Sequence, residues 1–237
     1  MKKNAEINKN LKMGQNVVID KNVRIGGNVR LGNNVIIYSK VKLGDNVVIM
    51  DNAVIGKPVV LGRNSNRKQP FVDWLIIKNN VSIGTNSVIY GGSMIDEGVY
   101  IADMVNIREN CKINRNVTIG KMVSIEFNVT IGEHSRVLDC SQITEFTKIG
   151  KGVFIGPDVS LSVDPYFARI PEGDRIIIIR DYAMIGGNST IGPGVTVGKN
   201  SLVASGAVVL KNVPRKKVVM GNPAKVVWDV NPALIKK

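Results

Sequence analysis

The hydrophobic positions of this sequence recur with a period of six residues. From Ile7 to Leu61, every sixth position carries an aliphatic residue or Met. The period resumes at Ile77 and continues to Leu161, and it returns a third time from Ile179 to Val209. An α-helix would require a period of about 3.6 residues, so these three blocks are predicted to be non-helical.

The polar positions of each six-residue block are equally regular. Of the 25 Asn residues, 16 fall three positions after the aliphatic residue, where the backbone is expected to bend. The position four after the aliphatic residue takes small or β-branched residues such as Val23, Ser87 and Ala183. Because Asn tolerates the left-handed backbone region, each block is predicted to be a short strand closed by a tight turn.

Three such blocks form one eighteen-residue turn of a parallel β-helix, in which each aliphatic residue stacks on its equivalent in the next coil. The 31 blocks therefore predict an all-β solenoid of about ten triangular coils. At about 4.8 Å per strand layer, such a solenoid is about 48 Å tall. We expect one domain, residues 1–237.

The period is interrupted at two internal segments and at the C-terminal end. We expect surface loops at residues 62–76 and 162–178, and a C-terminal cap with a short helix at 211–237. Loops that leave a solenoid are usual binding elements. The second loop is the stronger candidate because it brings Asp164, Tyr166 and Arg169 close together in the sequence.

The C-terminal repeats and the ending VVMGNPAKVV resemble the hexapeptide-repeat acyltransferases. The resemblance implies a left-handed β-helix, although general crossover statistics favour the right-handed form. It also implies a homotrimer in which acetyl-coenzyme A lies in the groove between neighbouring subunits. By position, Gly186, Ala204, Gly206 and Lys225 match the residues that contact this co-substrate in the family. Each glycine is equally well explained as a corner residue.

The segment VFIGPDVSLSVDPY resembles the sugar-nucleotide N-acetyltransferases of this family, with Asp164 in the place of an acid that holds the sugar. We therefore expect Asp164, with Tyr166 and Arg169 of the same loop, to bind the substrate. Relatives often carry Asn before that acid, whereas this chain has Val163. His134 is the single histidine and is expected to point outward from a corner. It is the candidate general base, and a substrate-assisted route without a side-chain base remains open.

The net charge of +13 favours polyanionic ligands such as coenzyme A and a nucleotide-sugar. No nucleic-acid recognition motif, membrane-spanning run or signal peptide is evident, and two cysteines are too few for a disulfide framework. We therefore expect a cytoplasmic protein. One histidine cannot supply a three-histidine zinc site, so no catalytic metal is expected.

Together these features predict an acetyl-coenzyme-A-dependent N-acetyltransferase that acts on the amine of a nucleotide-linked amino sugar. An O-acetyltransferase of the same fold is one alternative. A non-catalytic β-helical scaffold that binds a partner along its faces is the other.

Overall fold

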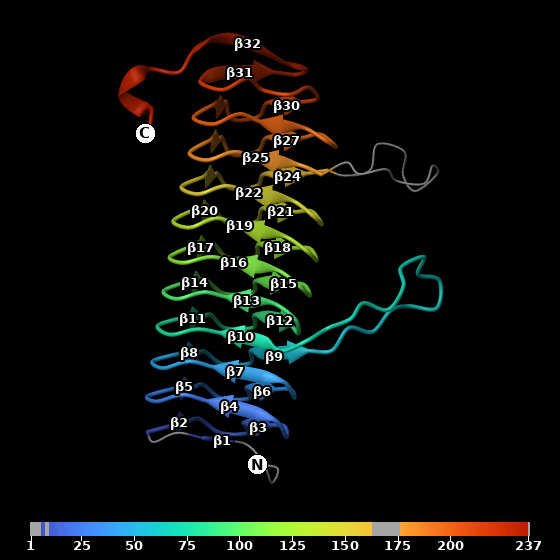
Figure 1. Ribbon diagram of the computed structural model, residues 1–237, viewed down its shortest axis with the longest axis vertical. Helices are drawn as coiled ribbons and strands as arrows, with labels where there is room; N and C mark the ends of the chain where they lie inside the picture. The colour runs from blue at the N-terminus through green and yellow to red at the C-terminus, as the bar shows by residue number, and fades with distance from the viewer. Residues whose placement is uncertain (1–5, 8–9, 163–175, 237) are drawn as a thin grey trace. The chain divides into compact units, whose positions relative to one another are not determined.

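The structure is a computed structural model that describes residues 6–7, 10–162 and 176–236. The contacts between residues divide the chain into two compact units, residues 1–116 and 117–237, and each is described by itself. Both units are parallel β-helices, and successive coils wind in the left-handed sense (Figure 1). The predicted fold class is confirmed, whereas the expectation of a single domain stays a prediction.

In the first unit, three parallel sheets surround the core, and every third strand belongs to the same sheet. Sheet A contains β1 (Glu6–Ile7), β4 (Val23–Ile25), β7 (Val41–Leu43), β10 (Leu75–Ile77), β13 (Met94–Ile95) and β16 (Lys112–Ile113). Sheet B contains β2 (Lys12–Met13), β5 (Arg30–Leu31), β8 (Val48–Ile49), β11 (Ser82–Ile83) and β14 (Tyr100–Ile101). Sheet C contains β3 (Val18–Ile19), β6 (Ile36–Ile37), β9 (Val54–Lys57), β12 (Val88–Tyr90) and β15 (Asn106–Ile107).

The second unit repeats this arrangement. Its sheet A contains β19 (Thr130–Ile131), β22 (Lys148–Ile149), β25 (Ile178–Ile179) and β28 (Thr196–Val197). Its sheet B contains β17 (Thr118–Ile119), β20 (Arg136–Val137), β23 (Phe154–Ile155), β26 (Met184–Ile185), β29 (Leu202–Val203), β31 (Lys217–Gly221) and β32 (Ala224–Asp229). Its sheet C contains β18 (Ser124–Ile125), β21 (Gln142–Ile143), β24 (Ser160–Leu161), β27 (Thr190–Ile191) and β30 (Val208–Val209).

The side-chain pattern of each strand follows the six-residue period. In β4, Val23 and Ile25 are buried in the core while Arg24 between them is exposed. Equivalent aliphatic residues pair across coils, as Ile131 does with Ile149. Each turn contains one residue in the left-handed region, and in most turns of the first unit this residue is Asn. At Asn28 the φ angle is 57°, and its side-chain amide donates to Asn46 Oδ1 at 3.2 Å.

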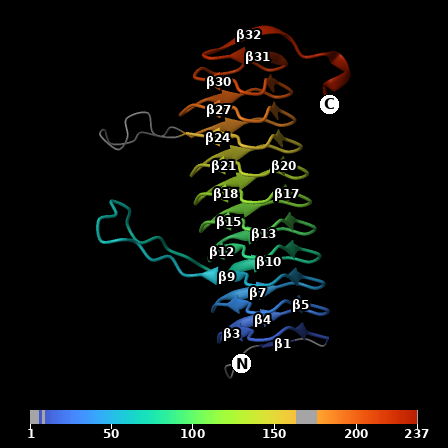
Figure 2. The ribbon, with the colours of Figure 1, turned by 180° about the vertical axis from the view of Figure 1, so that it is seen from behind.

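The first interruption of the period is a surface excursion, residues 58–74, between β9 and β10 (Figures 1 and 2). We call this segment the arm; β10 begins at Leu75, so the arm ends two residues before the predicted boundary. Arg67 of the arm contacts the Glu109 carboxylate at 2.6 Å, and Asn110 Nδ2 donates to the Phe71 carbonyl oxygen at 3.2 Å. These contacts hold the arm against the coils of the first unit.

The C-terminal end of the second unit has the expected short helix, a 3₁₀ turn, but is built mainly from two strands. Strand β31 continues sheet B in parallel with β29, and β32 then pairs with β31 in the antiparallel sense. The only helical element among the described residues after Val209 is a single 3₁₀ turn, Pro232–Leu234. An antiparallel strand explains the difference, because β32 gives the terminal strand β31 a hydrogen-bonding partner.

Candidate functional site

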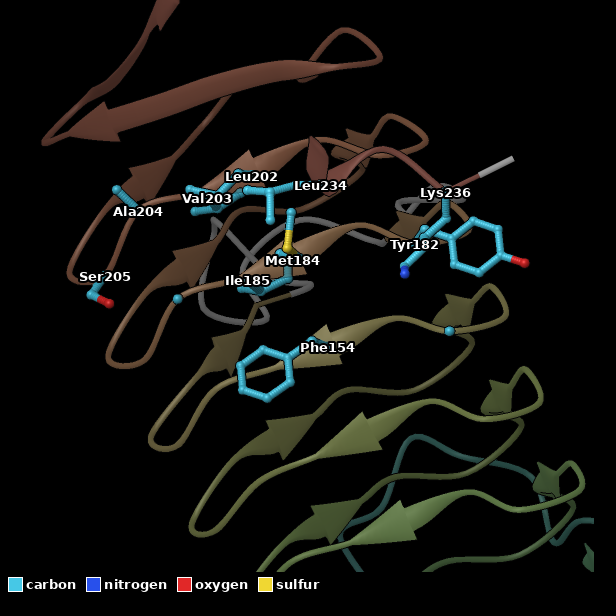
Figure 3. A pocket seen from close by; sticks show the side chains of 12 residues that line it. Phe154, Tyr182, Met184, Ile185, Leu202, Val203, Ala204, Ser205, Leu234 and Lys236 are labelled. Carbon is cyan, nitrogen blue, oxygen red and sulfur yellow. The ribbon is translucent and has the colours of Figure 1, made fainter. Parts of the chain in front are cut away.

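A groove of about 620 Å³ lies on the outer face of sheet B in the second unit (Figure 3). Phe154, Met184 and Leu202 point outward from three neighbouring strands, β23, β26 and β29, and form its apolar floor. The complete lining is Gly152, Phe154, Tyr182, Met184, Ile185, Gly186, Leu202, Val203, Ala204, Ser205, Leu234 and Lys236.

The edge of the groove toward sheet C is made of small residues. Gly186 and Ala204, both predicted contacts of the co-substrate, occupy equivalent positions on successive coils and line the groove. Small side chains leave the backbone open to a ligand that lies flat on the surface. At Gly186 packing is also a reason for glycine, since an added Cβ would lie 2.4 Å from the Ser205 nitrogen.

Gly206 and Lys225 lie close to this edge without lining the groove. Gly206 is the following corner residue, with φ of 71° and open space beside it. Lys225 is exposed on β32 and pairs with Met220 of the neighbouring strand β31. Val219, the residue before Met220, pairs in turn with Val203 of β29. The strand spacing therefore places the Lys225 backbone about 10 Å from the coil that carries Ala204.

The opposite edge, toward sheet A, combines an aromatic ring with lysines. The ring of Tyr182 lies over Gly152, where an added Cβ would be 2.5 Å from ring atom Cδ1. The ammonium groups of Lys151 and Lys199 lie 5.6 and 5.7 Å from the ring centroid. Lys236 adds a third cation to this edge. Anionic groups of a ligand are thus favoured on this side of the apolar floor.

His134 lies at the same corner column as Gly152 and Tyr182. It is exposed, with φ of 58°, at the turn between β19 and β20. The backbone carbonyl oxygen of its neighbour Glu133 accepts a hydrogen bond from the Gly152 nitrogen at 2.8 Å, so His134 is one coil from the edge of the groove. The corner that carries His134 is therefore next to the groove, where a proton acceptor for a ligand there would need to be.

The three residues expected to bind the substrate, Asp164, Tyr166 and Arg169, lie outside the described residues. Their segment follows β24, which ends at Leu161 in sheet C. The predicted meeting of Asp164 and His134 at one groove stays a prediction.

Sequence reasoning missed the apolar floor and the wall formed by the end of the chain. Phe154, Met184 and Leu202 occupy the outward position directly before the repeat aliphatic residue, where Thr118 and Arg136 stand on earlier coils. When the coils are aligned in the sequence, three apolar residues in succession at that outward position indicate an apolar surface patch. Leu234 and Lys236 lie outside the repeat and carry no comparable signal.

Among the described residues, no three His, Cys, Asp or Glu side chains are grouped as a metal site would require. In the same part of the chain, no helix has the length and apolar character needed to cross a membrane.

The coils and the groove define a left-handed parallel β-helix with a ligand-sized surface site. Residues 10–44 and 177–211 match the family described as bacterial transferase hexapeptide (six repeats). These two segments therefore match the hexapeptide-repeat family, and the sequence resembles the acyltransferases built on that repeat.

Local sequence similarity to curated enzymes covers a short part of the chain. The chain is 48% identical over 54 residues to 2,3,4,5-tetrahydropyridine-2,6-dicarboxylate N-acetyltransferase of Clostridium perfringens, which is 23% of each protein. It is 51% identical over 51 residues to the enzyme of the same name from Staphylococcus aureus, covering 22% of this chain and 21% of that protein. The chain thus spans less than a quarter of the length of these relatives.

Among solved structures, the UDP-N-acetylglucosamine acyltransferase of Campylobacter jejuni aligns with 96% of this chain and 74% of its own chain. The sequence identity is 17% and the TM-score is 0.43.

Proposed function

We propose that the protein is an acyl-coenzyme-A-dependent acyltransferase that transfers an acetyl group to the amine of a nucleotide-linked amino sugar. The observation that carries the proposal is the groove on sheet B of the second unit. It joins an apolar floor to small residues at one edge and lysines at the other. A coenzyme A thioester has matching parts, namely a long neutral pantetheine arm and a polyanionic nucleotide.

In this proposal the pantetheine arm lies along Gly186 and Ala204, and Lys225 beyond that edge meets the phosphates of coenzyme A. The lysines at the opposite edge attract the second polyanion, the nucleotide-sugar. The net charge of +13 supports the binding of two polyanionic substrates. The acceptor amine attacks the thioester carbonyl carbon to form a C–N bond. The C–S bond then breaks and coenzyme A leaves as the thiol, while backbone amides at the groove stabilise the oxyanion.

The proton released by the amine needs an acceptor, and we propose His134 for this role because it lies one coil from the edge of the groove. Asp164, Tyr166 and Arg169 are proposed to hold the sugar nucleotide. In a homotrimer they can reach the groove from the neighbouring subunit, as the family resemblance implies.

The test is a thiol-release assay with acetyl-coenzyme A and a panel of acceptors. The panel contains nucleotide-linked amino sugars, the corresponding sugars with a hydroxyl in place of the amine, and tetrahydropyridine-dicarboxylate. Release with the amino sugars alone supports the proposal, and release with the hydroxyl sugars favours O-acetylation. If no acceptor releases thiol and coenzyme A does not raise the melting temperature, the chain is a scaffold. Ligand at a hundred times its Kd would add about 2.7 kcal/mol to stability.

A further inference from the structure

The last residues of the chain fold back from the end of sheet B toward the groove. We call residues 230–236 the C-terminal strap. Val230 is buried and its nitrogen donates to the Lys216 carbonyl oxygen at 2.8 Å. Asn231 Oδ1 then accepts from the Ala233 nitrogen at 3.0 Å and caps the 3₁₀ turn. The strap therefore leaves β32 in a fixed direction and crosses the side of the second unit (Figure 1).

The far end of the strap is held by the side chain of Asn200, the corner residue between β28 and β29. The Asn200 amide donates from Nδ2 to the Lys236 carbonyl oxygen at 2.8 Å, and its Oδ1 accepts from the Lys236 nitrogen at 3.0 Å. Asn200 is 2% exposed, whereas the corner residues Asn128 and Asn188 of the same unit are exposed. Asn200 is thus buried by the strap, with both ends of its amide paired.

Between these two fixed points, Leu234 forms part of the wall of the groove and lies near Met184 and Leu202 (Figure 3). Leu234 remains 49% exposed. The Leu234 backbone is held on both sides, yet half of its side chain is exposed beside the apolar floor. This exposed apolar surface is available for contact with a ligand.

We propose that the C-terminal strap is part of the donor site. Leu234 packs against the neutral arm of the thioester where it lies over Met184 and Leu202, and Asn200 is the positioning residue that holds the strap there. This inference rests on the proposed function, because coenzyme A is the ligand that it assigns to the groove.

The experiment measures the Kd of acetyl-coenzyme A by titration calorimetry in the full chain, without acceptor. Leu234→Ala removes the wall contact. Asn200→Gly removes both hydrogen bonds but keeps the left-handed corner, where glycine is free of strain. The controls are Leu210→Ala, an exposed leucine that does not line the groove, and Asn128→Gly, a corner at φ of 58°. We expect each test variant to raise the Kd about tenfold, equivalent to about 1.4 kcal/mol, and the controls to leave it unchanged.

The double variant separates positioning from general stability. If Asn200 acts through the strap, Asn200→Gly combined with Leu234→Ala raises the Kd no further than either change alone. Independent effects would multiply to about a hundredfold and would reject Asn200 as the positioning residue.

The outcomes for the strap and for the donor site are distinct. If the unmodified chain binds acetyl-coenzyme A and Leu234→Ala binds it equally well, the strap is not part of the site and the proposed function stands. If the unmodified chain does not bind it, the proposed function is rejected and the strap with it. Leu234 is half exposed, so its replacement tests the inference even where Asn200→Gly lowers the melting temperature.

Discussion

Replacing Glu109 by Gln should loosen the arm, residues 58–74, from the coils of the first unit. Glu109 follows β15, and its side chain is fully buried. Its carboxylate forms ion pairs with Arg67 of the arm at 2.6 Å and with Arg108 of the same coil at 3.0 Å. The change keeps the shape of the side chain and removes its charge, so it tests the ionic part of this anchor.

The expected loss of stability follows from how far each partner is exposed. Removing one partner of a fully buried ion pair costs about 3 to 5 kcal/mol, because the other charge is left without compensation. Here the Arg67 and Arg108 side chains are 31% and 24% exposed, so both guanidinium groups can regain water. The Gln oxygen also still accepts a hydrogen bond. We therefore expect a loss of about 1 to 2 kcal/mol.

The pH dependence gives the sign of this effect. Burial acts to raise the pKa of the Glu109 carboxyl, but hydrogen bonds from Arg67, its own backbone amide and Arg108 outweigh it and lower the pKa below 4.5. A lowered folded-state pKa stabilises the protein above the pKa of the unfolded chain. The stability gap between the native chain and Glu109→Gln should stay constant near neutral pH and close as the pH falls below 4.5.

Thermal melting from pH 3.5 to 7.5 measures the gap, and brief trypsin digestion measures release of the arm, which carries Arg63, Arg67 and Lys68. The matched control is Glu97→Gln. Glu97 forms an ion pair with Arg115 at 3.1 Å, but the two side chains are 41% and 55% exposed. Such a pair contributes about 1 kcal/mol or less. If Glu109→Gln melts like the native chain at pH 7 and its arm is cleaved no faster, the carboxylate is not the anchor.

Three further predictions concern the core, the chemistry and the assembly. Ile131→Asp places an unpaired carboxylate in the core, at a cost of several kcal/mol, and should abolish soluble folding. Thr130→Asp, on the outward side of the same strand, should fold, and equal melting of the two variants would contradict the register. If His134 is the general base, His134→Ala should lower kcat about 10² to 10⁴-fold with little change in KM for the sugar, and a near-normal kcat would favour the substrate-assisted route. Light scattering should give the mass of a trimer, and a monomer at micromolar concentration would reject a site between subunits.

The fold was predictable because the repeat places the same physical demand on every coil. One aliphatic residue and one small residue must point inward, and one residue must take the left-handed region at the turn. At Val29, Leu31 and Asn34 the structure meets this demand, with the first two buried and the third at φ of 56°. Residues 211–237 lack the repeat, so the β31–β32 pair could not be predicted from the sequence, and only a cap with a short helix was expected.

The site was predictable only in part, for a related reason. Gly186 and Ala204 were expected from the family resemblance, and they line the groove at equivalent positions of successive coils. Their contact with a co-substrate stays a prediction. The contact between Asn200 and Lys236 spans 36 residues and joins a corner to a segment with no period. Asn200 looks like any other corner asparagine in the sequence, and only the returning strap distinguishes it.

The outward position of each strand is the one that folding leaves free, so its residues carry information about function. In the second unit, sheet A carries Thr130, Lys148, Ile178 and Thr196 there, and the polar residues of sheet C run from Ser124 to Thr190. Among the described strands of this unit, sheet B alone has a run of apolar residues at this position, from Phe154 through Met184 and Leu202 to Val218. The strap covers them only in part, since Phe154 remains 39% exposed. This apolar column stays partly open in the folded chain, and contiguous apolar surface of this kind marks a binding site for a ligand or for another protein chain.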